Sequence, residues 1–101
     1  MFTCFIRYYI DSDKFSEFKE YARAWIFLIQ KHGAIHHGYF IPGTEADHMP
    51  SAALSFPSKE AYEQYRVSVA NDDLCKAATA RFEETKCFSS YERTFLIPMF
   101  E

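Results

Sequence analysis

Apolar and aromatic residues dominate the first ten positions of the chain and alternate there in a way typical of a β-strand. One face of a strand from Phe2 to Ile10 carries only apolar and aromatic side chains, namely Phe2, Cys4, Ile6, Tyr8 and Ile10. The other face carries Thr3, Phe5, Arg7 and Tyr9. We therefore expect the first face to lie under helices and the second to meet something other than an ordinary core.

The next segment has the spacing of an amphipathic helix. Apolar residues recur three and four positions apart at Phe15, Phe18, Ala22, Trp25 and Ile29. Asp11, Ser12 or Asp13 is expected to cap the start of this helix, because each side chain can accept the free amide hydrogens of a first turn. Gly33 is expected to end it, since glycine takes the left-handed conformation without strain.

Two strands and a polar segment follow. Residues 34–41 read as a second strand that ends at Pro42 and Gly43, and residues 44–50 are polar and turn-rich, as in a loop. Residues 52–56 form a short third strand.

The last third of the chain predicts helices and then a strand. Ser58 is a suitable N-cap for a helix that carries Tyr62, Tyr65 and Val69 inward. Asn71 is expected to cap a further helix, whose inward residues are Leu74, Ala77, Ala78 and Phe82. A long strand is expected over residues 87–97.

The element order is thus β-α-β-β-α(α)-β, which predicts an α+β, ferredoxin-like fold with one antiparallel sheet and helices on a single face. With 101 residues we expect one domain spanning 1–101. One side of such a sheet is uncovered, and here it carries aromatic and charged residues. We therefore expect a homodimer in which two sheets pack together as a dimeric α/β barrel.

Amino-acid composition and net charge limit the kinds of molecule that the chain is expected to bind. Aromatic residues make up 19% of the chain, more than a small core usually needs, so some rings are expected at an interface or pocket. The net charge of −3 argues against nucleic-acid and anionic-membrane partners. The first residues lack the basic start of a signal peptide, and the longest apolar run is too short to span a bilayer, so we expect a cytoplasmic protein.

The three cysteines, Cys4, Cys75 and Cys87, form no C-x-x-C pair and leave an odd one over. This number suits a reducing compartment better than a disulfide framework. We interpret them as small buried hydrophobic residues, with a reactive thiol as the alternative.

The segment "KHGAIHHGYFIPG" contains three of the histidines. Adjacent strand residues point to opposite faces, so His36 and His37 do not bind one metal ion together in a strand. His32 falls at a helix end and His48 in the loop, and their spacings match no usual zinc pattern. We expect no metal site. Strand parity favours His37 under the helices and His36 on the barrel side, an assignment that one β-bulge would exchange.

Polar residues on the first and last strands are the main candidates for ligand binding. These strands are antiparallel neighbours in the predicted fold, so Arg7 and Glu92 are placed to pair as a satisfied ion pair. In the alternative interpretation, Arg7, Tyr9 and His36 present a cation, a phenol and an imidazole to an anionic or phenolic ligand. The remaining candidates are His37, Tyr39, Tyr91, Glu92 and Arg93.

Catalytic and cofactor motifs are not evident. The sequence has no hydrolase elbow, phosphate loop or dinucleotide fingerprint, and its 3 glycines leave little room for a Gly-rich cofactor loop. We therefore expect no cofactor and assign no catalytic residue.

Four segments together resemble the NIPSNAP family: "MFTCFIRYYID", "KHGAIHHGYFIPG", "AALSFPSKEAYEQYR" and "YERTFLIP". The resemblance covers nearly the whole chain. It implies a homodimer of the dimeric α/β-barrel superfamily, with a pocket between each sheet and its helices or inside the barrel. It implies no particular reaction, although the wider superfamily includes cofactor-independent monooxygenases.

Two functional hypotheses follow. In the first, the chain is a monooxygenase-like enzyme or binding protein that holds a small aromatic or apolar molecule near Arg7, Tyr9, His36 and Tyr91. In the second, it is a non-enzymatic dimeric module for assembly or partner binding, as the wide apolar surface of the first helix suggests. The sequence favours the binding form of the first hypothesis and identifies neither the ligand nor a reaction.

Overall fold

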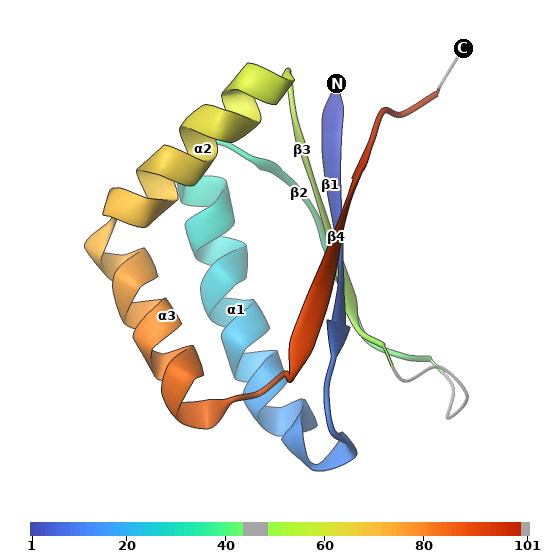
Figure 1. Cartoon of the computed structure of the whole chain (residues 1–101), viewed down its shortest axis with the longest axis vertical. Coiled ribbons are helices and arrows are strands. Elements are labelled where there is room, and N and C mark those ends of the chain that lie inside the picture. The colour runs from blue at the N-terminus through green and yellow to red at the C-terminus, as the bar shows by residue number, and fades with distance from the viewer. Residues whose placement is uncertain (44–48, 100–101) are drawn as a thin grey trace.

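In the part of the chain that the structure describes, four strands form one antiparallel sheet, and the helices lie on one face of that sheet (Figure 1). The computed structural model describes residues 1–43 and 49–99, so most of the predicted 44–50 loop lies outside the described residues. The elements are β1 (Phe2–Tyr9), a 3-10 turn η1 (Ser12–Lys14), α1 (Phe15–Lys31), β2 (Ile35–Phe40), β3 (Ser51–Phe56), α2 (Lys59–Asn71), α3 (Asp73–Thr85) and β4 (Ser90–Leu96). The strand order β2-β3-β1-β4 confirms the α+β, ferredoxin-like fold.

The two faces of β1 divide as its alternation predicts. Cys4, Ile6 and Tyr8 are buried in the core beneath the helices. Their neighbours on β3 are Leu54, opposite Cys4, and Ala52, opposite Ile6, and both are buried on the same side. We call the other side, which carries Phe5 and Arg7 of β1, the open face of the sheet.

Helix α1 buries the predicted stripe, but its start differs from the prediction. Phe18, Ala22 and Ile29 are buried, and Leu28 joins them although it lies outside the stripe. The N-cap residues are Asp11 for η1 and Lys14 for α1, and neither caps its helix with its side chain, while the side chain of Ser12 lies outside the described part of the structure. The 3-10 turn takes the place of a side-chain cap, since the Lys14 amide donates to the Asp11 carbonyl at 2.9 Å.

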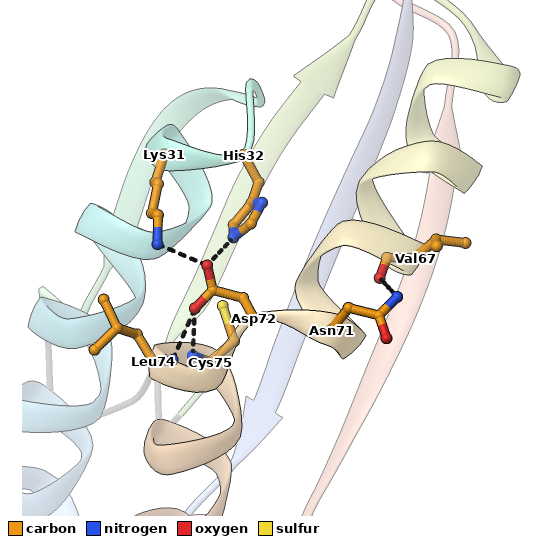
Figure 2. A network of polar contacts seen from close by, with 7 residues as sticks. All are labelled: Lys31, His32, Val67, Asn71, Asp72, Leu74 and Cys75. Atoms are coloured by element: carbon orange, nitrogen blue, oxygen red, sulfur yellow. Dashed lines mark hydrogen bonds and ion pairs between the residues drawn. The ribbon is translucent and has the colours of Figure 1, made fainter.

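Gly33 ends α1 as predicted. Its φ is +88°, in the region that favours glycine, and its amide donates to the Gln30 carbonyl at 3.1 Å. His32 is the C-cap residue of the helix, so its side chain stands at the end of α1 that faces the start of α3 (Figure 2).

The junction of α2 and α3 corrects the predicted cap. Ser58 caps α2 as expected, accepting from the Ala61 amide at 3.1 Å. Asn71 does not cap α3: it belongs to α2 and donates to the Val67 carbonyl at 3.0 Å. Asp72 takes the role instead. The residue that α3 buries fully is Cys75, whereas Leu74 stays 54% exposed, contrary to the prediction.

A β-bulge in β2 reverses the predicted orientation of the two histidines. The register with β3 shifts between His36 and Gly38, so His36 pairs with Leu54 on the helix side. His37 turns to the open face, where its Nε2 lies 2.6 Å from Ser55 Oγ. Gly38 has φ of +131°, which a residue with a side chain rarely adopts. The assignment of His36 to the barrel side was therefore wrong. After the bulge, Tyr39 lies on the helix side and Phe40 on the open face.

Strand β4 forms one edge of the sheet and is shorter than predicted. Cys87 and Phe88 are buried ahead of it, whereas all of its own residues are exposed. Helix α3 packs on α1 and α2, and the helix-side residues of β4 stay exposed whereas Cys4, Ile6 and Tyr8 of β1 are buried.

All three cysteines are buried, as the sequence predicts. Burial raises the pKa of each thiol, which makes the reactive-thiol alternative the weaker one. Within residues 1–43 and 49–99, every helix is too short or too polar to cross a bilayer.

Candidate functional site

A cavity of about 370 Å³ lies between the helix side of the sheet and the three helices. This volume falls within the range of about 300–1,000 Å³ typical of small-molecule pockets. Its walls are mainly aromatic and come from every helix and strand except η1. The rings that line it are Tyr8, Tyr21, Trp25, Tyr39, Tyr62, Tyr65, Phe82, Phe88 and Tyr91.

The pocket follows from the local patterns of its elements. Tyr8 reaches it because every second residue of β1 faces the helices, and Tyr21 and Trp25 are one turn apart on α1. Tyr8 packs edge-on against Phe18, with ring centroids 5.0 Å apart. Phe88, just before β4, stacks on Phe82 of α3 with centroids 4.2 Å apart. These ring pairs hold the walls in place beside the cavity.

Three phenol groups meet within this pocket. The Tyr8 side chain interacts with the side chains of both Tyr21 and Tyr39. Burial is the main cause of a raised pKa for all three phenols, so they are neutral near pH 7. Neutral hydroxyls can both donate and accept hydrogen bonds, and this cluster can therefore bind a carbonyl or hydroxyl oxygen of a ligand.

Two guanidinium groups line the same cavity from separate elements. Arg66 projects from α2 and Arg93 from the edge strand β4, and both lower the pKa of Cys4, against the larger raising effect of burial. Arg66 donates to the Tyr62 hydroxyl at 3.3 Å, and the Arg93 guanidinium lies 5.2 Å from the centre of the Tyr91 ring. Both residues line the cavity and are exposed, so their charges are in contact with solvent. They can pair with an anionic group of a ligand whose apolar part lies deeper.

The indole of Trp25 adds an unused donor. Its Nε1 is buried and has no hydrogen-bond partner among the described residues. A buried indole N–H usually has a partner, so this donor is an exception among the described residues.

The structure separates the predicted site residues into two groups. Tyr39, Tyr91 and Arg93 line the cavity. His36 is on the same side of the sheet and packs on Tyr39, with ring centroids 5.3 Å apart. Arg7, Tyr9, His37 and Glu92 lie instead on the open face. The predicted grouping of Arg7 and Tyr9 with His36 and Tyr91 is therefore wrong, because the sheet itself lies between them.

Several polar groups of the open face contact one another. Arg7 and Glu92 lie opposite each other in the register of β1 and β4, but the predicted ion pair between their side chains does not form among the described residues. A hydrogen bond with the Glu92 carboxylate raises the pKa of Tyr9, while Arg7 opposes the shift. Near β2, Ser55 Oγ lies 2.8 Å from Thr3 Oγ1 and 2.6 Å from His37 Nε2. Both sets of contacts fit a structural role.

Sequence reasoning missed several pocket residues. Tyr21 lines the cavity although it falls outside the predicted apolar stripe of α1. Its position at the edge of that stripe is the sequence feature that could have indicated a pocket residue. Trp25 and Tyr65 were predicted to point inward, and the structure places both in the cavity wall. No feature of the sequence indicates that Arg66 lines a pocket, since a single arginine on a helix usually faces solvent.

Comparison with known proteins agrees with this architecture. A family model described as NIPSNAP matches residues 3–100. An uncharacterized NIPSNAP domain protein from Burkholderia xenovorans has a similar structure, with a TM-score of 0.83 and 19% identity over 99% of this chain and 96% of that one. Among curated proteins, none matches the sequence.

Two further structures share the fold at lower similarity. One is a protein from Nitrosomonas europaea, named for a proposed role as an antibiotic biosynthesis monooxygenase, with a TM-score of 0.70 and 9% identity over 99% of this chain and 100% of that one. The other is a dimeric ferredoxin-like protein from an uncultured marine organism, with a TM-score of 0.63 and 16% identity over 99% of this chain and 94% of that one. At such identities the likeness extends to the fold.

Proposed function

The chain belongs to the NIPSNAP family, and on that premise we propose that it binds a small aromatic molecule carrying one anionic group. The observation that carries the proposal is the cavity of about 370 Å³, in which aromatic walls end at Arg66 and Arg93. The aromatic part of the ligand would lie among the rings and beside the Tyr8, Tyr21 and Tyr39 hydroxyls. Its anionic group would pair with the guanidinium groups at the opening.

Isothermal titration with naphthoate tests this proposal. We expect saturable binding of one molecule per chain, and weaker binding of naphthalene methanol, which has the same rings without the charge. Ala70→Trp should abolish binding because Ala70 lines the cavity, and a bulky side chain there would fill it. Ala77→Trp, on the exposed surface of α3, is the matched control and should bind normally. Equal binding by both variants would contradict the proposal.

A monooxygenase-like reaction is the second candidate function. It is supported by the resemblance of the fold to the Nitrosomonas europaea protein and by phenols that can hold an oxygen-bearing substrate. The protonation states of the pocket side chains favour binding without catalysis. The thiol and phenol groups there have raised pKa values, so none of them can act as a base near pH 7. These groups belong to Cys4, Tyr8, Tyr21, Tyr39 and Tyr65. Oxygen uptake with a hydroquinone substrate, abolished by Ala70→Trp, would favour the enzyme instead.

We also propose that two copies of the chain pack through their open faces. Large apolar side chains are exposed there, including Ile35 at 47%, Phe40 at 52% and Leu96 at 47%. A monomer that leaves such a patch in water forgoes the free energy of burying it. The structural neighbour from a marine organism is itself called dimeric, which supports this arrangement. Light scattering should give twice the mass of the chain, and a monomer at micromolar concentration would exclude the dimer.

A further inference from the structure

Three possible metal ligands of different chemistry meet where the end of α1 faces the start of α3. His32, Asp72 and Cys75 each offer one ligand atom there, and these atoms all lie within 4.8 Å of one another. Figure 2 shows the imidazole, carboxylate and thiol at this junction. Cys75 is 1% exposed, and the side chains of His32 and Asp72 are 13% and 10% exposed. The cluster lies apart from the residues of the sequence-predicted site.

The local structure explains why the two oxygens of Asp72 have different roles. Oδ1 caps α3 by accepting from the amides of Leu74 at 2.7 Å and Cys75 at 3.2 Å. Oδ2 faces α1 and lies 2.8 Å from His32 Nε2 (Figure 2). Cys75 follows Asp72 by three residues, so its side chain emerges on the same side of the first turn. A metal ion on Oδ2 would therefore leave the helix cap intact.

We infer that His32, Asp72 and Cys75 form a binding site for a divalent ion of the zinc class. Thiolate, imidazole and carboxylate are the three ligand types that zinc combines in proteins. Tetrahedral zinc with bonds of about 2.0–2.3 Å places its ligand atoms roughly 3.3–3.6 Å apart. The present separations begin at 2.8 Å and reach no more than 4.8 Å, so they bracket the separations that tetrahedral zinc requires. Three protein ligands leave the fourth position to water.

Lys31 competes with such an ion for the same oxygen. Its Nζ lies 2.7 Å from Asp72 Oδ2, and its side chain is 42% exposed. The ammonium group can therefore swing into solvent when an ion takes its place. Binding also requires the Cys75 thiol to release its proton, since the thiolate is the ligand. The ion would displace the Lys31 ammonium group and the hydrogen bond between His32 and Asp72. Its three bonds to the protein would then join α1 to α3.

Cobalt titration of the tag-free, EDTA-treated full chain tests the site, because a cobalt–thiolate bond gives a charge-transfer absorption band. We expect one Co²⁺ per chain with this band, and its displacement by Zn²⁺. Cys75→Ala should remove the band, and Cys87→Ala, which alters another buried thiol, should keep it. A folded wild-type protein without the band, or a band that survives Cys75→Ala, would overturn the inference.

Two further variants keep the test decisive if Cys75→Ala does not fold. His32→Gln alters a residue at the end of a helix and should weaken Co²⁺ binding by at least roughly tenfold, whereas His37→Gln on the open face should not. Lys31→Ala should tighten binding, because the competing ammonium is gone. A purely structural Lys31–Asp72–His32 clamp predicts no tightening, and that result would also overturn the inference.

Discussion

His36 and His37 are consecutive in the sequence, yet their rings lie on opposite faces of the sheet. His37 Nε2 is 2.6 Å from Ser55 Oγ on the open face. His36 packs on Tyr39 beneath the helices, and its Nε2 is buried without a hydrogen-bond partner among the described residues. The two histidines therefore occupy different environments, and protonation should affect them differently.

His36 should make the protein sensitive to mild acid. Burial, and to a lesser extent the neighbouring His37, lowers the pKa of His36. The unfolded chain, with a histidine pKa of about 6.5, then binds a proton before the folded chain does, so stability is full above that pH and falls below it. The loss for one proton is at most about 1.4 kcal/mol per pH unit.

Urea unfolding between neutral pH and pH of about 5 measures this effect. The free energy of unfolding of His36→Gln should vary less with pH than that of the wild type. The matched variant His37→Gln should keep most of the wild-type slope, because burial is the larger cause of the lowered pKa of His36. Identical slopes for wild type and His36→Gln would show that His36 does not carry the effect.

Asp72 should contribute to stability both as a cap and as a charge. Asp72→Ala loses the cap of α3 and should lower the free energy of unfolding by about 1 kcal/mol or more at neutral pH. Asp72→Asn keeps a capping oxygen and loses the charge, so its loss should be smaller. Chemical denaturation at neutral pH ranks the two variants. If Asp72→Asn lowered the free energy of unfolding as much as Asp72→Ala does, the charge of Asp72 would contribute more than its role as a cap.

The charge of Asp72 adds a separate dependence on acid. A hydrogen bond from Lys31 is the main reason that the pKa of Asp72 lies well below its usual range. The associated stability is present above the unfolded pKa of about 3.9 and is lost as the pH falls through the folded pKa. Acid unfolding of Asp72→Asn should therefore lack this contribution, and an unchanged acid slope would contradict it.

Arg93 should matter to naphthoate binding and Arg7 should not. Arg93 lines the cavity, whereas Arg7 lies on the other face of the sheet, opposite Glu92 in the strand register. Loss of a hydrogen bond to a charged group costs about 1.5–3 kcal/mol, so Arg93→Gln should weaken binding roughly 10- to 100-fold. Calorimetry on Arg93→Gln and Arg7→Gln makes the comparison. A larger loss from Arg7→Gln would place the ligand on the open face.

Phe40 should be required for the proposed dimer. It lies on the open face and is 52% exposed, whereas Phe27 lies on α1 and is 62% exposed. Phe40→Glu would place a charge in the apolar contact and should yield a monomer. Phe27→Glu makes the same change at an equally exposed site on the helix side and should leave a dimer. Sedimentation velocity measures both, and a dimeric Phe40→Glu would rule out this interface.

Local patterns predict the fold well, because strand alternation and helix spacing depend on near neighbours. The two faces of β1, the buried stripe of α1 and the caps at Gly33 and Ser58 are all confirmed. The bulge beside Gly38 was not predictable in the same way. It depends on how β2 fits against β3, and one extra residue there exchanges the faces of every residue before it.

The candidate site was predicted only in part, because it depends on contacts between distant segments. Arg93 and Tyr91 were among the predicted candidates, and both line the cavity. Trp25, Tyr21 and Arg66 join them through the packing of α1 and α2, which spacing along the chain does not show. The His32, Asp72 and Cys75 cluster likewise joins residues about forty positions apart, so histidine spacing alone gave no sign of it.

The indole N–H of Trp25 offers the most direct test of the proposed pocket. The chain has 1 tryptophan, so a ¹H–¹⁵N spectrum shows a single indole signal, and the side chain of Trp25 lines the cavity. On titration with naphthoate, we predict that the indole signal shifts and saturates together with the amides of Tyr91 and Arg93. An indole signal that stays fixed while the amides of Phe5 and Ser55 shift would contradict binding in the pocket and place the ligand on the open face.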